Sequence, residues 1–266
     1  MREAVIVSTA RTPIGKAFRG AFNNTQAQEL GAHAILNAVQ RAGIDPALVE
    51  DVVIGCAAQQ GTSGGNTARQ SLLRAGLPVT VSGMTIDRAC SSGLMAIATA
   101  AKQVVVDGMQ VTVGGGLESI SLVQSGKPNT HRARDPYLME HIPALYMAMI
   151  ETAEIVADRY GISREAQDEY SVQSQTRTAQ AQKEGRFAQE IVPMSTVMTV
   201  TDKETGAVSE KAITLSIDEG NRPGTSLDDL TKLKPVFKDG QVVKEGRFIT
   251  AGNASQISDG AAALLL

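Results

Sequence analysis

Cys56 and Cys90 are the two thiol side chains of the 266-residue chain. Cys90 follows an apolar run, residues 81–86, and precedes a long apolar pattern of helical period, so we expect it in a turn at or near a helix N-terminus. Unsatisfied amides and the helix dipole favour an anion there, and the thiolate is the form of cysteine that attacks carbonyl groups. From position alone, a nucleophile and a small buried hydrophobic residue are equal interpretations of Cys90.

The other candidate ligands and nucleophiles favour a structural interpretation. Cys56 lies inside a predicted strand, where a small buried hydrophobic role is expected. Neither cysteine belongs to a Cys-x-x-Cys motif and the chain has 3 histidines, so we expect no metal site. His33 falls on an amphipathic helix, and His131 and His141 lie in a later segment with no catalytic motif around them. The residues after Cys90, at 91–93, are small and would leave room for a substrate beside its sulfur.

The bulk composition excludes several classes of partner. A net charge of −3 and a pI of about 5.7 give no electrostatic footprint for nucleic acid or an anionic membrane. Residues 1–10 do not resemble a signal peptide, and no run of about 18 apolar residues is evident, so no membrane span is expected. These features predict a reduced, cytoplasmic protein.

Short apolar runs alternate with helical patterns in the first third of the chain. We expect buried strands at residues 4–8, 51–56, 81–86 and 111–113, and again at 261–266. Helices are expected from a capping box at Thr25 and Gln28 to Gly43, over 66–75 and over 90–106. Strands alternating with helices predict an α/β layered fold.

The middle of the chain is more charged and more helical. Helices are expected over 151–160 and 164–186, and a pair of strands over 189–200 and 208–215. The simplest organisation is an α/β domain formed by residues 1–118 and 251–266, interrupted by an inserted domain, residues 119–250. The last strand of the α/β domain would then come from the end of the chain.

Four blocks of this sequence resemble the thiolase family, in the family's order. Residues 87–97, DRACSSGLMAI, are similar to the acyl-enzyme signature, and residues 5–15, VIVSTARTPIG, to the family's N-terminus. Residues 114–119, GGGLES, are similar to the glycine-rich turn that opens the loop domain, and residues 250–262 to the block that closes the N-terminal half. The resemblance implies a layered α/β/α half-sandwich with an inserted, mainly helical loop domain that binds coenzyme A and makes oligomer contacts.

The resemblance also implies acyl transfer through Cys90. Thiolases form an acyl-cysteine thioester during cleavage of 3-ketoacyl-CoA or condensation of acetyl-CoA, with coenzyme A as substrate and no further cofactor. The Cys90 thiolate would attack the carbonyl, and the backbone N–H of Cys90 is a candidate donor to the oxyanion. The alternative is a ketoacyl-synthase-like condensing enzyme, since that family carries a similar Ala-Cys-Ser-Ser segment.

The second base of the family lies in a C-terminal half that these residues do not include. The Gly-His-Pro and Cys-x-Gly-Gly blocks of that half have no counterpart here. We therefore interpret the chain as an N-terminal half, from a truncated protein, proteolysis or a split gene, that is inactive without its C-terminal half. A non-catalytic assembly fragment is the further alternative.

The resemblance further implies contacts to coenzyme A from the inserted domain. They are, in chain order, Met149, Arg222, Phe237, Ala251 and Ser255. This sequence departs from the common family pattern with Ala148, Asp229 and Asp87. A homodimer or tetramer is expected, although residues 124–146, where the family makes tetramer contacts, diverge most. The apolar pattern of residues 90–106 surrounds the helix, so one side would stay uncovered and favour association.

Overall fold

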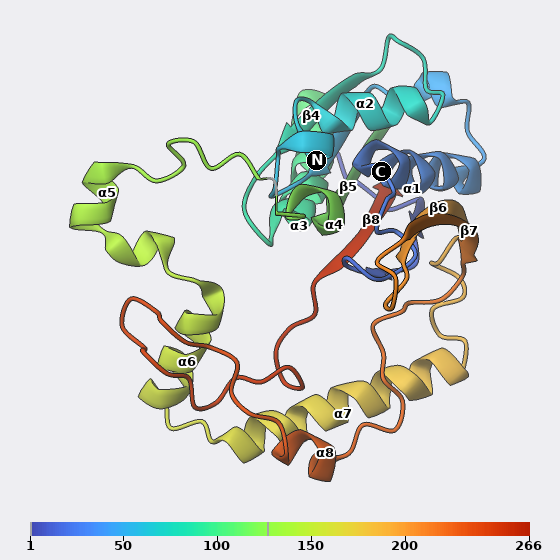
Figure 1. The fold of residues 1–266 in the computed structure, drawn as a ribbon. Helices are drawn as coiled ribbons and strands as arrows, with labels where there is room; N and C mark the ends of the chain where they lie inside the picture. Colours follow the sequence, from blue (N-terminus) through green and yellow to red (C-terminus); the bar gives the residue numbers. More distant parts are fainter. Residues whose placement is uncertain (1, 127) are drawn as a thin grey trace. The chain divides into compact units, whose positions relative to one another are not determined.

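The computed structural model describes residues 2–126 and 128–266, which form two compact units (Figure 1). Unit 1 consists of Met1–Pro128, Phe187–Gly220 and Ile257–Leu266. Unit 2 consists of Asn129–Arg186 and Asn221–Gln256.

Unit 1 is built on a mixed sheet with the strand order β1-β8-β5-β3-β4, and β2 pairs with β8. The strands are β1 (Ser8–Arg11), β2 (Gly15–Lys16), β3 (Asp51–Gly55), β4 (Ser82–Ile86), β5 (Thr112–Ser119) and β8 (Ser258–Leu265). β3 is parallel to β4 and β5, whereas β8 is antiparallel to β1, β2 and β5. The end of the chain thus supplies a strand of the sheet, as predicted, and this strand lies in the interior, between β1 and β5.

Helices cover both faces of this sheet. α1 (Ala27–Ala42) and α2 (Thr67–Arg74) bury their apolar residues with Val52 and Ile54 of β3. α3 (Ser92–Lys102) buries Ala96 and Ala100 with the intervening Val53, which points to the opposite face because side chains alternate along a strand. A π-helical turn, η3 (Gln103–Asp107), extends α3. The sheet therefore lies between two helical layers, which confirms the predicted α/β fold class.

The remaining elements are shorter or belong to unit 2. In unit 1 they are η1 (Pro46–Leu48), η2 (Gly61–Ser63), α4 (Ile120–Val123), β6 (Met194–Thr201) and β7 (Val208–Leu215). In unit 2 they are α5 (Pro136–His141), η4 (Pro143–Tyr146), α6 (Met149–Arg159), α7 (Arg164–Lys183) and α8 (Leu227–Thr231).

The β6–β7 hairpin packs with the sheet unit, which differs from the predicted boundaries of 1–118 with 251–266 and 119–250. The backbone of Arg11 bonds to Glu190 and Val192, at 3.0 Å and 2.9 Å, just before the hairpin. Met194 and Leu215 are buried in the same core as α1. Apolar burial against unit 1 therefore holds residues 187–220, which the charge pattern of the sequence had grouped with the helices.

The predicted N-terminal strand begins later than its apolar pattern indicated. Val5, Ile6 and Val7 are 62%, 60% and 53% exposed, and β1 starts at Ser8. The N–H of Val7 bonds to Leu265, and among the described residues no strand pairs with the segment before Val7. The prediction of a fully buried strand over residues 4–8 was wrong because pairing, and not apolarity alone, sets where a strand begins.

The predicted capping box at the start of α1 is also wrong. The N-cap is Gln26, and no side-chain cap bond is present there. Thr25 Oγ1 instead lies 2.7 Å from Thr196 Oγ1, and Gln28 donates to the Thr62 carbonyl at 2.7 Å. Tertiary partners have taken both side chains that local reasoning had assigned to the cap.

The segment Ala89–Asp107 is long and apolar enough, by length and composition alone, to cross a membrane. The expectation that no such segment exists was therefore wrong. The core helix of a globular protein meets the same criterion, and in this structure Ala96, Ala100 and Val104 pack on the sheet. Leu94 and Val106, at 72% and 76%, are exposed on the outer side of the same segment, as its all-round apolar pattern predicted.

Candidate active site

Cys90 is exposed in the turn between β4 and α3, directly before the N-cap residue Ser91. The residue before it, Ala89, has a φ of 48°, a left-handed conformation that costs free energy for a side chain with a Cβ and commonly marks functional turns. The predicted place of Cys90 beside a helix N-terminus is confirmed. Its role as the nucleophile stays a prediction.

Side-chain hydrogen bonds hold this turn in its strained shape. Ser92 Oγ accepts from the Arg88 N–H at 2.8 Å and donates to the Ala89 carbonyl at 2.6 Å. Asp87 Oδ1 accepts from the Ala89 N–H at 2.7 Å, and Ser91 Oγ donates to the Arg88 carbonyl at 2.8 Å. Ser92, expected to leave room for a substrate, lines the same cavity as Cys90, and its buried hydroxyl also fixes the turn.

Glycines let α3 lie directly against the strands beneath it. A Cβ on Gly55 would be 2.1 Å from the Ser92 carbonyl carbon, and one on Gly114 would be 2.8 Å from Ile97 Cα. A Cβ on Gly116 would be 3.0 Å from Gly93 Cα. No real Cβ tolerates the first two distances, so these residues set how deep the helix start, and with it Cys90, lies on the sheet.

Cys90 borders a cavity of about 840 Å³, a volume typical of small-molecule sites. The turn, the ends of β3 and β5, α4 and β8 all contribute to its lining. Its residues include Gly55, Ala58, Ala89, Cys90, Gly93, Glu118, Ile120, Asp259 and Ala262. A substrate could thus reach the sulfur from a partly apolar hollow at the edge of the sheet.

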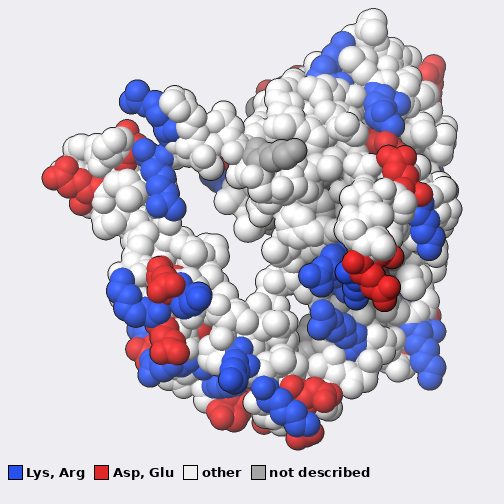
Figure 2. All heavy atoms as spheres, viewed as in Figure 1, with Lys and Arg blue, Asp and Glu red and all other residues white. Residues whose placement is uncertain are grey.

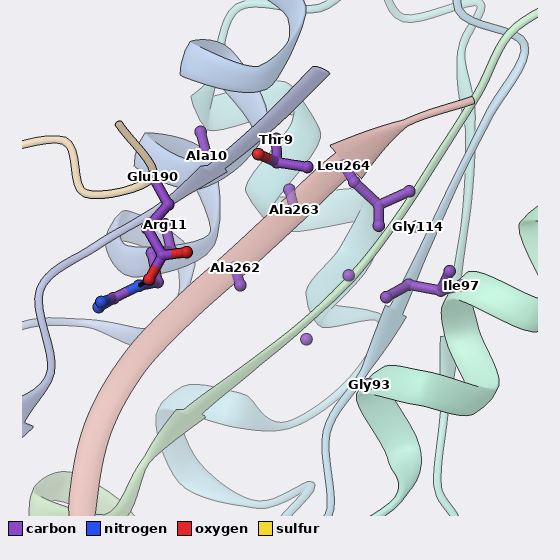
Figure 3. Close-up of a pocket in the computed structure, with 12 residues that line it drawn as sticks. Thr9, Ala10, Arg11, Gly93, Ile97, Gly114, Glu190, Ala262, Ala263 and Leu264 are labelled. Atoms are coloured by element: carbon purple, nitrogen blue, oxygen red, sulfur yellow. Dashed lines mark hydrogen bonds and ion pairs between the residues drawn. The ribbon is translucent and has the colours of Figure 1, made fainter. Parts of the chain in front are cut away.

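A second cavity, of about 410 Å³, lies over β1, β8 and β5 beside Gly93 and Ile97 of α3 (Figure 3). It shares Arg11, Gly93, Gly116 and Ala262 with the cavity at Cys90. Arg11 is bound by Glu190 at 2.9 Å and by Asp218 at 2.7 Å. Burial alone would lower the pKa of Arg11, but these two carboxylates raise it above its ordinary value, so Arg11 is a paired structural cation.

Cys56, in contrast to Cys90, is buried. Its Sγ lies 3.6 Å from Glu118 Oε1, and Glu118 also accepts from the N–H groups of Ala57 and Ala58 at 3.0 and 3.1 Å. Burial, together with the Glu118 carboxylate, raises the pKa of the Cys56 thiol to about 12. The structural interpretation of Cys56 is therefore confirmed.

Asp259 belongs to the lining of the Cys90 cavity. It is buried and accepts from both the N–H and the hydroxyl of Ser121, at 2.9 Å and 2.5 Å. Ser121 Oγ in turn accepts from the N–H of Phe18 at 2.6 Å, a residue with a φ of 66°. Burial raises the pKa of Asp259 despite these bonds. The network ties α4 and β8 to the loop after β2.

The predicted coenzyme A contacts all lie in unit 2. Met149 is 77% exposed at the first turn of α6, and Arg222, Ala251 and Ser255 are also exposed. Phe237 is half-buried, with its ring against Gly240 and its Cβ near Gly246.

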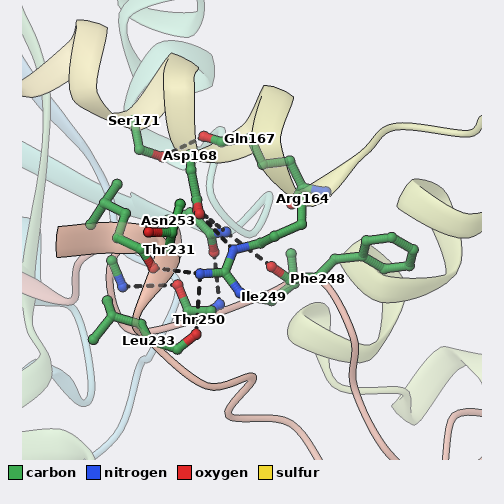
Figure 4. Close-up of polar contacts among 12 residues, drawn as sticks. Arg164, Gln167, Asp168, Ser171, Thr231, Leu233, Phe248, Ile249, Thr250 and Asn253 are labelled. Carbon is green, nitrogen blue, oxygen red and sulfur yellow. Dashed lines mark hydrogen bonds and ion pairs between the residues drawn. The ribbon is translucent and has the colours of Figure 1, made fainter. Parts of the chain in front are cut away.

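Some of the predicted contact residues lie near different parts of α7 within unit 2. The N–H of Arg222 donates to Gln175 in the middle of α7, whereas Asn253, between Ala251 and Ser255, bonds to Asp168 of the same helix (Figure 4). Asp168 and Gln175 are about 10 Å apart along the helix axis. Nothing in this geometry assigns coenzyme A to either set of residues, so these contacts stay predictions.

Buried carboxylates in unit 2 were missed by the sequence reasoning. Glu151, Glu154 and Asp168 are 1%, 2% and 0% exposed, and each accepts several hydrogen bonds. The available signal was the pair of glutamates three residues apart inside the apolar pattern of residues 149–157.

His33 and His141 have structural partners. His33 Nε2 lies 3.1 Å from the Val192 carbonyl, and His141 stacks on Tyr137 with ring centroids 4.0 Å apart. On the face shown in Figure 2, basic and acidic side chains are interspersed and form no large patch of one sign. This distribution agrees with the low net charge.

Curated relatives align over nearly the whole chain. A 3-ketoacyl-CoA thiolase of Bacillus subtilis is 43% identical over 100% of this chain and 66% of its own length. The peroxisomal 3-ketoacyl-CoA thiolase A of Mus musculus is 41% identical, with 99% of this chain and 59% of the relative covered. For peroxisomal 3-ketoacyl-CoA thiolase 1 of Arabidopsis thaliana the identity is 38%, with 99% and 57% covered. The chain thus spans less than two thirds of each of these relatives.

A family model supports the same assignment. The thiolase N-terminal domain matches residues 4–266, which includes the Cys90 turn, the strands beneath it and all of unit 2. By this match and these relatives, the chain belongs to the thiolase family and comprises its N-terminal domain.

Proposed function

We propose that this chain supplies the acyl-accepting nucleophile of an acyl-CoA acyltransferase of the thiolase type. The observation that carries the proposal is the exposed Cys90, held in a left-handed turn before α3 at the border of a cavity of about 840 Å³. Cys56, the other thiol, is buried, and burial raises its pKa to about 12. Family membership and the names of the relatives support acyl-CoA substrates.

In the proposed reaction, the Cys90 thiolate attacks the carbonyl of an acyl thioester. The new C–S bond to Cys90 forms, the bond to coenzyme A breaks, and coenzyme A leaves as a thiolate that takes up a proton. With a 3-ketoacyl-CoA the attack is on the ketone carbon, and the bond to the α-carbon breaks. The α-carbanion of acetyl-CoA is then protonated, and a coenzyme A thiolate releases the acyl group from Cys90.

A backbone amide at the start of α3 would stabilise the developing oxyanion. The N–H groups of Ser91 and Ser92 are bonded to the Arg88 and Ala89 carbonyls within the turn, so the backbone N–H of Cys90 is the proposed donor, and the helix dipole also favours negative charge there. The second base, implied by the family to be a histidine and a cysteine of the C-terminal half, is proposed to come from residues outside this chain.

Unit 2 is proposed to hold coenzyme A as a substrate, without a further cofactor. Met149 and Phe237 offer apolar surface for the pantetheine arm, and Ala251 and Ser255 offer a small side chain and a hydroxyl beside it. Arg222 is exposed and carries the planar fork of donors that suits phosphate. A cytoplasmic homodimer or tetramer, completed by the C-terminal half, is part of the same proposal.

Two alternatives make different predictions. A ketoacyl-synthase-like enzyme would take acyl groups from acyl-carrier protein, and a non-catalytic half would take none. The relatives named 3-ketoacyl-CoA thiolases favour coenzyme A thioesters.

Acylation of the protein separates these possibilities. The chain is incubated with acetyl-CoA or with acetyl-acyl-carrier protein, and peptides are mapped by mass spectrometry. Acetyl-CoA is expected to acetylate Cys90, Cys90→Ser to abolish the product, and Cys56→Ser to keep it. Labelling from the carrier protein alone would establish the synthase alternative, and no labelling from either donor would support the non-catalytic half.

A further inference from the structure

Residues 235–250 of unit 2 form an irregular hairpin that carries Phe237. The Val236 N–H bonds to the Ile249 carbonyl at 3.0 Å, and the Gly246 N–H bonds to the Phe237 carbonyl at 2.9 Å. At the tip, the Gly240 N–H bonds to the Val243 carbonyl at 3.0 Å. Several main-chain N–H groups on its returning side, between Val242 and Ile249, are bound by side chains of α6.

Glu154 of α6 binds the returning side of this hairpin. Its carboxylate accepts from the N–H groups of Arg247, Phe248 and Ile249 at 2.9, 3.1 and 2.7 Å, while its side chain is buried. A Cβ on Gly246 would lie 2.8 Å from Glu154 Oε1. The carboxylate is therefore enclosed by a concave stretch of backbone. A carboxylate, which has two oxygen acceptors, can accept from all three of these N–H groups.

Glu151, one helical turn earlier, binds the tip of the hairpin. Its Oε1 accepts from the N–H groups of Val242 and Val243 at 2.6 and 3.0 Å. Burial alone would raise the pKa of Glu151, but the backbone donors and Lys244 bring it below its ordinary value. A Cβ on Gly240 would lie 2.6 Å from this carboxylate. Residues three apart share one face of a helix, so Glu151 and Glu154 fix the hairpin along α6.

Asp168 of α7 holds the segment that follows the hairpin (Figure 4). It accepts from Arg164 Nε at 2.7 Å and from Asn253 Nδ2 at 2.9 Å, and it is fully buried. Asn253 Oδ1 accepts from the Thr250 N–H at 2.7 Å, and Arg164 also donates to the Leu230 carbonyl at 2.6 Å. Ala251 lies inside the short loop that the bond between Thr250 and Asn253 closes.

These contacts fix parts of unit 2 that regular secondary structure does not. Residues 232–256 contain no helix and no strand, and their β pairing is limited to isolated bridges. The buried carboxylates therefore replace a sheet ladder as partners of the backbone. The residues they position are Phe237 on the hairpin, Ala251 and Ser255 beyond it, and Met149, two residues before Glu151 on α6.

We propose that Glu151, Glu154 and Asp168 are positioning residues for coenzyme A: they set the mutual placement of Met149, Phe237, Ala251 and Ser255. The inference rests on the proposed function of unit 2. It predicts that loss of one carboxylate weakens recognition of the coenzyme A moiety and spares the reactivity of the acyl thioester itself.

The test compares two acetyl donors on Glu154→Gln, with Glu169→Gln, an exposed glutamate of α7, as matched control. Acetylation of Cys90 is followed with acetyl-CoA and with S-acetyl-N-acetylcysteamine, which lacks the nucleotide. Glu154→Gln is expected to raise the half-saturating acetyl-CoA concentration about tenfold, the effect of losing one charge-assisted bond and leaving donors unpaired. The preference for acetyl-CoA over the short thioester should fall by the same factor, and Glu169→Gln should resemble the wild type.

An unaltered preference in Glu154→Gln, with backbone exchange at residues 247–249 shown to be faster, would overturn the inference. Glu151→Gln and Asp168→Asn, which act on different segments, are measured in parallel, so a single unfolded variant does not end the test. If neither donor acetylates the wild type, the proposed function fails. Calorimetric binding of coenzyme A to the wild type and to Glu154→Gln then decides the inference, and equal affinities refute it.

Discussion

The buried Cys56 has its Sγ 3.6 Å from Glu118 Oε1, whereas Cys90 is exposed in the turn that precedes α3. The chain thus holds two thiols with opposite surroundings. Burial and the Glu118 carboxylate keep Cys56 protonated, because they raise its pKa to about 12. Its reaction as a thiolate is therefore suppressed throughout the neutral range.

Iodoacetamide is expected to label Cys90 at pH 7–8 and to leave Cys56 unmodified until the protein unfolds. The pKa of Cys56 is raised in the folded state, so its contribution to stability is complete below the thiol's ordinary pKa of 9.0 and is lost as pH rises towards about 12. No dependence on Cys56 ionisation is expected near neutrality. Peptide mapping checks the labelling, and a label mainly on Cys56 in the folded protein would contradict it.

Gly55→Ala is expected to destabilise unit 1 by about 2 kcal/mol, since the new Cβ would lie 2.1 Å from the Ser92 carbonyl carbon and force α3 off the sheet. Gly93→Ala is the matched control on the other side of the contact, where the nearest atom is 3.7 Å away. The control should be neutral or stabilising by about 1 kcal/mol, because alanine favours the helix. Urea unfolding measures both, and equal losses would show that close helix packing does not set this site.

Arg11→Met is expected to cost about 3 kcal/mol, since it leaves Glu190 and Asp218 as partly buried carboxylates without their cation. The loosened segment should be the one that carries the β6–β7 hairpin. Asp228→Asn, which breaks the exposed pair with Lys232, is the control and should change stability by less than about 0.5 kcal/mol. Thermal unfolding and protease cleavage within residues 187–220 report the two effects; an intact hairpin in Arg11→Met would refute the assignment.

Acid should loosen the tip of the unit 2 hairpin. The pKa of Glu151 lies below the ordinary value of 4.5, so its stabilising contribution is present above pH 4.5 and is lost as pH falls through the folded-state pKa. Amide exchange at Val242 and Val243, corrected for the intrinsic pH dependence, should accelerate in that range. Glu151→Gln should remove this pH dependence, and a variant that retains it would assign the effect to another group.

The chain is expected to self-associate through the outer side of α3 and of the η3 turn that extends it. Leu94 and Val106 are 72% and 76% exposed there. Leu94→Gln should weaken association about tenfold, the value of one buried leucine side chain. Leu48→Gln, an exposed leucine on η1, is the control. Analytical ultracentrifugation tests this, and a wild-type monomer at high concentration would show the prediction to be wrong.

The sequence alone determined the fold class and the place of Cys90. Apolar runs of strand length before and after a helical pattern are local signals, and they located β3, β4 and α3 to within a few residues. The turn at Cys90 followed from the same pattern, because a strand that ends beside a helix start leaves few positions between them. The motif blocks then indicated the family, which the comparisons show.

Tertiary structure alone decided which distant groups bind the buried charged side chains. Arg11 binds Asp218 across 207 residues, and Glu154 binds Ile249 across 95. Neither pair has a local signal, because periodicity reports which face of an element is buried and not which distant segment covers it. The same limit explains why the sequence did not predict that residues 187–220 belong to unit 1 or that Val5 to Val7 are exposed. Strand pairing and burial depend on partners that only the folded chain brings together.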